Sequence, residues 1–240
     1  MAPPARERRA AKPVRQATLA VERSIGADSV LLVGMDEVGR GALAGPVCVG
    51  VVGVFDLRRE VPAGLTDSKL LSAARRAELV DPIKAWADVW AIGEASPGEV
   101  EQCGIIEALR RAGRRALLAV AGGGTCADAV LLDGSHDWLS APAARQDSLW
   151  EAGFAEQSGE PWPPVVPRVT TRVKADVECA TVAAASVLAK CYRDALMVEL
   201  ARQHPEYGWD SNVGYGSAAH RAAIAAYGVT DHHRASWCRR

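Results

Sequence analysis

Apolar residues along the chain form short runs with the length and β-branched content of strands, and longer stretches with the spacing of helices. The strand-like runs cover residues 29–36, 46–55, 129–134 and 168–174. Helical spacing predicts a short helix over residues 16–25, which Gly26 ends, and longer helices over residues 70–90, 100–120 and 177–200. Because only a glycine-rich turn separates the first two strand-like runs, we expect them to pair as antiparallel neighbours at the centre of a sheet.

Three segments lie outside this pattern. Residues 1–14 are rich in Pro and Arg, residues 136–164 form a long polar excursion rich in Trp and Pro, and short helical patterns follow residue 203. Strands followed by packed helices predict an α/β fold, here with a small helical C-terminal region. We divide the chain into a basic tail, predicted to be disordered, with a short helix (1–28), a main domain that includes the excursion (29–198) and the C-terminal region (199–240).

Composition and charge narrow the class of protein. The chain has 240 residues, 49% of them hydrophobic, which excludes a wholly disordered or fibrous protein. Apolar runs stay well short of the ~20 residues of a membrane span, and the first residues lack a signal-peptide pattern, so we expect a soluble, cytoplasmic protein without membrane contact. The first 15 residues carry five basic residues against one acidic residue, while the whole chain has a net charge of −1. If this acidic body acts on a polyanion, metal ions must supply part of the positive charge.

Four carboxylates stand at the ends of predicted strands or at the start of the last long helix. Asp36 and Glu37 follow the first strand-like run, Asp133 ends a later one, and Asp176 precedes the helix. Singly, each has an ordinary interpretation, as solvated surface, a turn or a helix N-cap. Together, carboxylates on neighbouring strand ends repel one another unless a cation neutralises them.

Oxygen-only ligands favour Mg²⁺ or Mn²⁺ over zinc. Two such ions ~4 Å apart are typical of phosphodiester hydrolysis. One geometrical difficulty concerns Asp36 and Glu37, because adjacent residues of a regular strand point to opposite faces. Either the strand breaks at this point, or Glu37 contributes partly through its backbone.

Six blocks of the sequence, in order, resemble the ribonuclease HII family, the bacterial type 2 ribonucleases H. They are residues 34–48 (GMDEVGRGALAGPVC), 66–72 (TDSKLLS), 130–134 (VLLDG), 174–194 (KADVECATVAAASVLAKCYRD), and the pair 214–220 (GYGSAAH) and 233–237 (HRASW). The blocks span most of the chain. The resemblance implies a ribonuclease H-like mixed sheet flanked by helices, and a monomeric endonuclease.

The implied activity is hydrolysis of RNA in RNA–DNA hybrids and incision 5′ of ribonucleotides embedded in duplex DNA, with two divalent ions, Mg²⁺ or Mn²⁺. Carried over to this sequence, the metal-binding catalytic acids are Asp36, Glu37, Asp133 and Asp176. The implied substrate contacts are Gly39, Arg40 and Gly41 at the ribose 2′-hydroxyl, Tyr215 on the adjoining deoxyribose, and Lys69, Ser186 and Lys190. Glycines fit this role because they let backbone groups approach a sugar, whose 2′-hydroxyl both donates and accepts hydrogen bonds.

Some positions depart from the family pattern. Ala175 stands where the family usually has Gly, Ser217 where Thr is usual, and residues 211–213 lack a common lysine. We expect the lost lysine to weaken phosphate attraction without affecting the chemistry. On the long helix, Ser186, Lys190 and Arg193 share one face by their spacing, which predicts either phosphate contacts or a solvated stripe. Trp86 and Trp90, four apart, are predicted to lie in the core.

Two other functions stay open. A non-catalytic hybrid-binding protein of the same fold would be favoured by the loss of any one acid, and all four are present. Another metal-dependent nuclease on a related core, such as a resolvase or a 3′ exonuclease, would need no group that recognises a 2′-hydroxyl, so the Gly39–Gly41 segment and Tyr215 argue against it.

Overall fold

The computed structural model describes residues 16–140 and 167–239. Within these ranges the chain forms one mixed sheet of five strands in the order β3-β2-β1-β4-β5. The strands are β1 (Leu32–Val38), β2 (Val47–Gly53), β3 (Val89–Ala95), β4 (Ala129–Asp133) and β5 (Arg168–Arg172). β1 pairs antiparallel with β2 and parallel with β4, while β2–β3 is antiparallel and β4–β5 is parallel. The predicted mixed α/β sheet is confirmed, with β1 and β2 adjacent and β1 at its centre.

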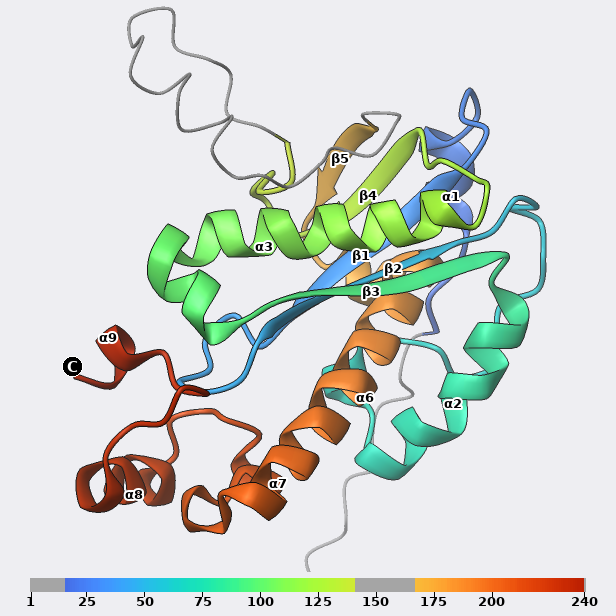
Figure 1. The fold of residues 1–240 in the computed structure, drawn as a ribbon. Coiled ribbons are helices and arrows are strands. Elements are labelled where there is room, and N and C mark those ends of the chain that lie inside the picture. The colour runs from blue at the N-terminus through green and yellow to red at the C-terminus, as the bar shows by residue number, and fades with distance from the viewer. Residues whose placement is uncertain (1–15, 141–166, 240) are drawn as a thin grey trace, which may run out of the picture.

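Helices cover both faces of the sheet (Figure 1). α3 (Pro97–Gly122) lies across one face, and α6 (Ala180–Gln203) and α2 (Ala73–Trp86) cover the other. Val33 and Met35 of β1 pack in the cluster beneath α3, whereas Gly34 faces α6, where an added Cβ would lie 2.3 Å from the backbone N of Val182. A glycine is therefore required for α6 to approach the sheet this closely. By the alternation of a strand, Asp36 lies on the same α6 face as Gly34.

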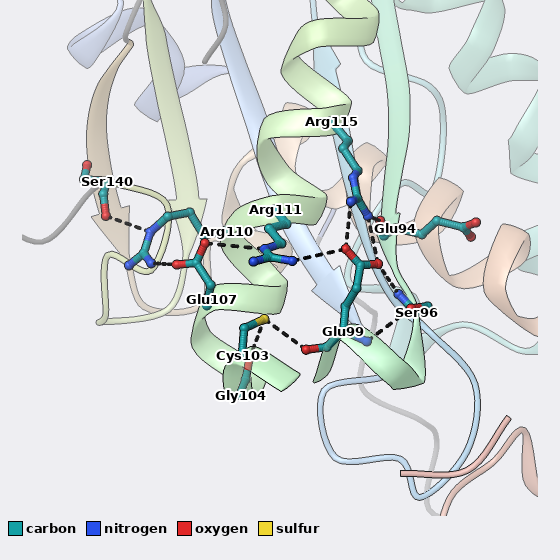
Figure 2. Close-up of polar contacts among 10 residues, drawn as sticks. All are labelled: Glu94, Ser96, Glu99, Cys103, Gly104, Glu107, Arg110, Arg111, Arg115 and Ser140. Atoms are coloured by element: carbon teal, nitrogen blue, oxygen red, sulfur yellow. Dashed lines mark hydrogen bonds and ion pairs between the residues drawn. The ribbon is translucent and has the colours of Figure 1, made fainter. Parts of the chain in front are cut away.

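The first turns of α3 form a separate segment, tied to the rest of the helix by charged side chains. Gly104, at φ 76°, interrupts the helical geometry, and a capping box between Ser96 and Glu99 starts the segment. Figure 2 shows Arg115, beyond the kink, reaching back to both Glu99 oxygens at 2.7 and 3.1 Å, and to the Glu94 carbonyl at 2.7 Å. Partial burial would favour a neutral Glu99, but the hydrogen bonds from Arg115 and Ser96 outweigh it and lower the pKa of Glu99 to about 2.

The helix predicted over residues 70–90 is wrong in its last part. The predicted range begins at the end of the short turn η1 (Ser68–Leu70). α2 then runs only from Ala73 to Trp86, and the chain continues into β3. Trp86 is buried as expected, but Trp90 lies on the strand, 41% exposed, with the Lys84 ammonium 4.5 Å from its ring centroid. The four-residue spacing of the two tryptophans imitates a helix face, and only pairing with β2 shows that the second one belongs to a strand.

The remaining helices lie near the start of the described chain and on either side of α6 in the sequence. The short N-terminal helix is α1 (Ala20–Ile25), with Gly26 at its C-cap as predicted. α5 (Ala175–Glu178) precedes α6, and η2 (Pro205–Tyr207), α7 (Trp209–Asn212), α8 (Ala218–Tyr227) and α9 (Ala235–Cys238) follow it. Tyr207 and Trp209 stack with ring centroids 5.0 Å apart, in a core cluster that includes Met197 of α6 and Ala44 of the β1–β2 connection. The division of the chain into 1–28, 29–198 and 199–240 stays a prediction.

The first residues of the excursion predicted over 136–164 include a buried pair instead of polar surface. Trp138 and Leu139 are each 1% exposed and pack in the core cluster beneath α3. The sequence signal failed because polar neighbours surround this buried pair. Residues 141–166 and the basic tail through residue 15 lie outside the described residues.

Candidate active site

Asp36 occupies a buried position near the end of β1. It is 4% exposed, its Oδ1 accepts a hydrogen bond from the Glu37 N–H at 2.8 Å, and Ser186 of α6 hydrogen-bonds to the carboxylate. β1 continues as a paired strand through Glu37 and Val38, so the suggested break at Glu37 is wrong. The Glu37 side chain leaves the opposite face of the strand and accepts a hydrogen bond from Arg40 Nη1 at 3.3 Å.

Parallel pairing brings the other two acids to the same edge of the sheet. Met35 and Leu132 are register partners, so Asp36 and Asp133 come next on neighbouring parallel strands. Asp176 lies in α5, directly after β5, and its backbone N–H donates to Asp133 Oδ1 at 3.4 Å. Because the carboxyl ends of parallel strands meet at one edge, three acids from distant parts of the sequence gather there.

The acids repel one another. Burial, followed by the charges of Glu37 and Asp133, raises the pKa of Asp36 to about 8, despite its hydrogen bond to Ser186. The pKa of Asp176 is also raised, first by burial and then by Asp133 and Asp67. Both shifts mean that the ionised carboxylates lack sufficient positive charge around them.

Lys69 and Asp67 lie beside the acids. The Lys69 ammonium is 3.5 Å from Asp176 Oδ2 and 4.0 Å from Asp67 Oδ1, and the charge of Asp36 also acts on it. Asp67 is 8% exposed and caps η1, since its Oδ1 accepts the Lys69 N–H at 2.9 Å. Sequence reasoning missed Asp67 as part of the site, although it stands in the same block as Lys69.

The predicted polar stripe on α6 splits into three different environments. Ser186 is 3% exposed beneath Asp36, with its Oγ 2.8 Å from the Oγ of Ser68. Lys190, one helical turn beyond Ser186, donates to Asp194 at 2.7 Å. Arg193 is 0% exposed and bonds only to backbone carbonyls among its described hydrogen-bond partners, so a solvated stripe is wrong for this residue. The substrate contacts predicted for Ser186 and Lys190 stay predictions.

The second half of the site is the loop between β1 and β2, residues 39–45, called here the Gly39–Gly45 loop. Its backbone is hydrogen-bonded to the C-terminal region: the N–H groups of Leu43 and Ala44 both donate to the Gly214 carbonyl, at 2.8 and 3.1 Å. Tyr215 therefore stands next to this loop, 38% exposed, with its ring centroid 5.6 Å from the Arg193 guanidinium. The structure thus places Tyr215 beside residues 43–44 of the loop that also contains Gly39, Arg40 and Gly41.

The structure shows the surroundings of the positions that depart from the family pattern. Ser217 caps α8 through its hydroxyl, which accepts the His220 N–H at 3.1 Å, a role that the usual Thr would also fill. Ala175 is fully buried at the start of α5. Asn212 accepts the Gly214 N–H at 2.8 Å and so shapes the turn before Tyr215.

The donor set fits divalent metal ions by its chemistry. As the side chains stand, no group of three or more His, Cys, Asp or Glu residues in the described chain is arranged to hold a metal ion. However, Asp36, Glu37, Asp133 and Asp176 offer oxygen ligands alone, and a bound divalent cation would relieve the repulsion that raises the pKa of Asp36 and Asp176. To hold one metal ion together, these side chains would have to turn toward one another from the positions described.

Comparison with known proteins identifies the family. A family model described as Ribonuclease HII matches residues 33–240, which is most of the chain. The chain belongs to the ribonuclease HII family. The Ribonuclease HII of Streptomyces coelicolor is 43% identical over 232 residues, covering 94% of this chain and 85% of that protein.

Solved structures agree at the level of the fold. The ribonuclease H2 of Pyrococcus horikoshii superposes with a TM-score of 0.62 at 22% identity, over 86% of this chain and 93% of that one. A structure of Bst-RNase HIII in complex with Mn²⁺ superposes with a TM-score of 0.59 at 19% identity, over 98% of this chain and 70% of that one.

Family membership establishes the reaction class. The protein is therefore a metal-dependent ribonuclease H, an endonuclease that hydrolyses RNA in RNA–DNA substrates. None of the helices in the described part of the chain is long and apolar enough to cross a membrane.

Proposed function

We propose that this protein cuts RNA in RNA–DNA hybrids and incises 5′ of single ribonucleotides embedded in duplex DNA, with Asp36, Glu37, Asp133 and Asp176 as ligands of two Mg²⁺ or Mn²⁺ ions. The main support for this proposal is that buried carboxylates, which repel one another, lie together at one edge of the sheet. When bound, the ions would activate the attacking water and stabilise the leaving oxygen.

The chain's own residues position the substrate. The Lys69 ammonium, held beside Asp176 in the described structure, supplies a positive charge next to the acids for a substrate phosphate. The open side of Gly41 supports close approach of a sugar, since an added Cβ would meet no atom within 4 Å. The partly exposed ring of Tyr215 is available to pack on the next deoxyribose.

Several finer predictions accompany this proposal. We propose that the enzyme acts as a monomer in the cytoplasm and needs no membrane. Its substrates are RNA–DNA hybrids and ribonucleotide-containing duplex DNA. Comparing the cleavage rates with Mg²⁺ and with Mn²⁺ shows which ion the enzyme prefers.

The test is cleavage of one duplex with a single embedded ribonucleotide, with and without Mg²⁺ or Mn²⁺, and with the product ends mapped. We expect metal-dependent incision 5′ of the ribonucleotide, no cleavage of an all-DNA duplex, and loss of cleavage in Asp36→Asn and Asp133→Asn with the fold retained. Binding without cleavage would indicate a non-catalytic hybrid-binding protein, and equal cleavage of all-DNA would indicate a different nuclease.

A further inference from the structure

Two buried arginines hold the Gly39–Gly45 loop by its carbonyl oxygens. Arg234, just before α9, donates from Nη1 to the Arg40 carbonyl at 2.8 Å, and from Nη2 to the carbonyls of Gly39 at 2.7 Å and Gly45 at 3.1 Å. Arg193, on α6, donates to the carbonyls of Pro46, Ala44 and Val213 at 2.8, 2.9 and 2.8 Å. The loop, α6 and the C-terminal region are therefore joined through two guanidinium groups.

Burying these two arginines costs free energy, because each charged guanidinium loses its contact with water. Ordinary surface arginines do not have this cost. Both residues are 0% exposed, and neither forms an ion pair with a carboxylate within residues 16–140 and 167–239. Burial, then the charge of Arg193, lowers the pKa of Arg234 to about 10, so Arg234 remains charged at neutral pH. A buried charge without a counterion is stable only where dipoles surround it, and here the loop carbonyls supply them.

The direction of the loop carbonyls fixes the direction of its N–H groups. In a trans peptide the C=O and the following N–H point in opposite directions. With the carbonyls of Gly39 and Arg40 turned toward Arg234, the N–H groups of Arg40 and Gly41 point away from it. No described group accepts a hydrogen bond from either N–H, and the Cβ position of Gly41 faces open space. Two adjacent free donors of this kind form a site for an oxygen acceptor.

We propose that Arg234 is a positioning residue for substrate specificity: it turns the carbonyls of Gly39 and Arg40 inward and so aims two backbone N–H groups at an oxygen of the bound ribonucleotide. Arg193 joins the same loop to Val213, two residues before Tyr215, which fixes the spacing between the two sugar contacts. Gly39 belongs to this arrangement, because an added Cβ would lie 2.2 Å from Arg193 Nε. The inference rests on the proposed sugar contact of the Gly39–Gly41 segment.

The experiment compares binding of two duplexes that differ by one 2′-hydroxyl, in an Asp133→Asn background that prevents cleavage. Arg234→Lys keeps the charge but replaces the three-carbonyl fork with a single ammonium. We expect this variant to lose the extra affinity for the ribonucleotide duplex, by roughly tenfold for the loss of one or two aimed hydrogen bonds, while affinity for the all-DNA duplex stays within about twofold. The matched control is Arg59→Lys, since Arg59 also donates to a carbonyl, that of Trp86, but far along the chain from the loop.

A second measurement on the Asp133→Asn protein with both arginines intact covers the case in which Arg234→Lys does not fold. We expect the amide NMR signals of Arg40 and Gly41 to shift more with the ribonucleotide duplex than with all-DNA. Three outcomes would overturn the proposal. They are an equal loss of affinity for both duplexes in a folded Arg234→Lys, the same loss of ribonucleotide preference in Arg59→Lys, and amide signals of Arg40 and Gly41 that shift no more with the ribonucleotide duplex than with all-DNA. Absence of any ribonucleotide preference before Arg234 is changed would instead overturn the proposed sugar contact itself.

Discussion

Replacing Asp36 by Asn should stabilise the metal-free protein, and should do so more strongly at alkaline pH. The folded protein raises the pKa of Asp36 from 3.8 to about 8, first by burial and then by the charges of Glu37 and Asp133. A carboxyl group whose folded pKa is raised lowers the free energy of unfolding once the pH passes its unfolded pKa, and the loss grows until the pH reaches the folded pKa. Asn removes this loss, and its amide can still accept the Glu37 N–H.

The magnitude follows from the two pKa values. Relative to a protein without the Asp36 carboxyl group, the raised pKa lowers the free energy of unfolding by about 2 kcal/mol at pH 5 and by about 5 kcal/mol at pH 8. We therefore expect the stabilisation by Asp36→Asn to be roughly 3–4 kcal/mol larger at pH 8 than at pH 5. With added Mg²⁺ or Mn²⁺, the unchanged protein should become more stable to unfolding than Asp36→Asn, because the metal stabilises the protein with all four carboxylates and binds the variant poorly.

Urea unfolding in EDTA at pH 5 and pH 8 measures this difference. The matched control is Asp128→Asn. Hydrogen bonds from the N–H groups of Leu31 and Val30 outweigh the partial burial of Asp128 and lower its pKa. Since both pH values lie above this lowered pKa, Asp128→Asn should destabilise the protein nearly equally at pH 5 and pH 8. A stabilisation by Asp36→Asn that does not grow with pH, or a destabilisation at pH 8, would refute the electrostatic account of the site.

Three further predictions concern single side chains. Tyr215→Ala should slow cleavage at a DNA–RNA–DNA junction more than cleavage within an all-RNA strand, with Tyr215→Phe milder because the ring face does the packing; an equal loss in both assays would leave junction specificity to another residue. Gly41→Val should keep the thermal midpoint and slow cleavage of both substrates, whereas Gly39→Ala should lower the midpoint, because Gly39 has φ +83° and a crowded Cβ position. Trp138→Ala should cost about 3–5 kcal/mol in urea unfolding, and a loss near zero would show that this tryptophan is not a core residue.

The sequence by itself determined most of the strands and the candidate acids. Runs of apolar and β-branched residues predicted four of the five strands that the structure describes; buried strands such as β2 and β4 need continuous apolar residues, whereas the β-branched residues of β5 mark a more exposed strand. It failed at β3, where alternating exposure and a misleading spacing of Trp86 and Trp90 hid a strand behind a helix. The motif blocks pointed to Asp36, Glu37, Asp133 and Asp176, since a family keeps its chemistry in short local segments.

Only the tertiary structure decided how these residues act together. That Asp133 lies beside Asp36 depends on the pairing of β1 with β4, a contact between residues far apart in the sequence. Burial of Arg193 and Arg234 could not be predicted either, because a lone arginine on a helix or near a terminus is usually solvated. Hydrogen bonds to carbonyls of a distant loop make that burial possible, and such partners appear only once the C-terminal region has packed against β1 and α6.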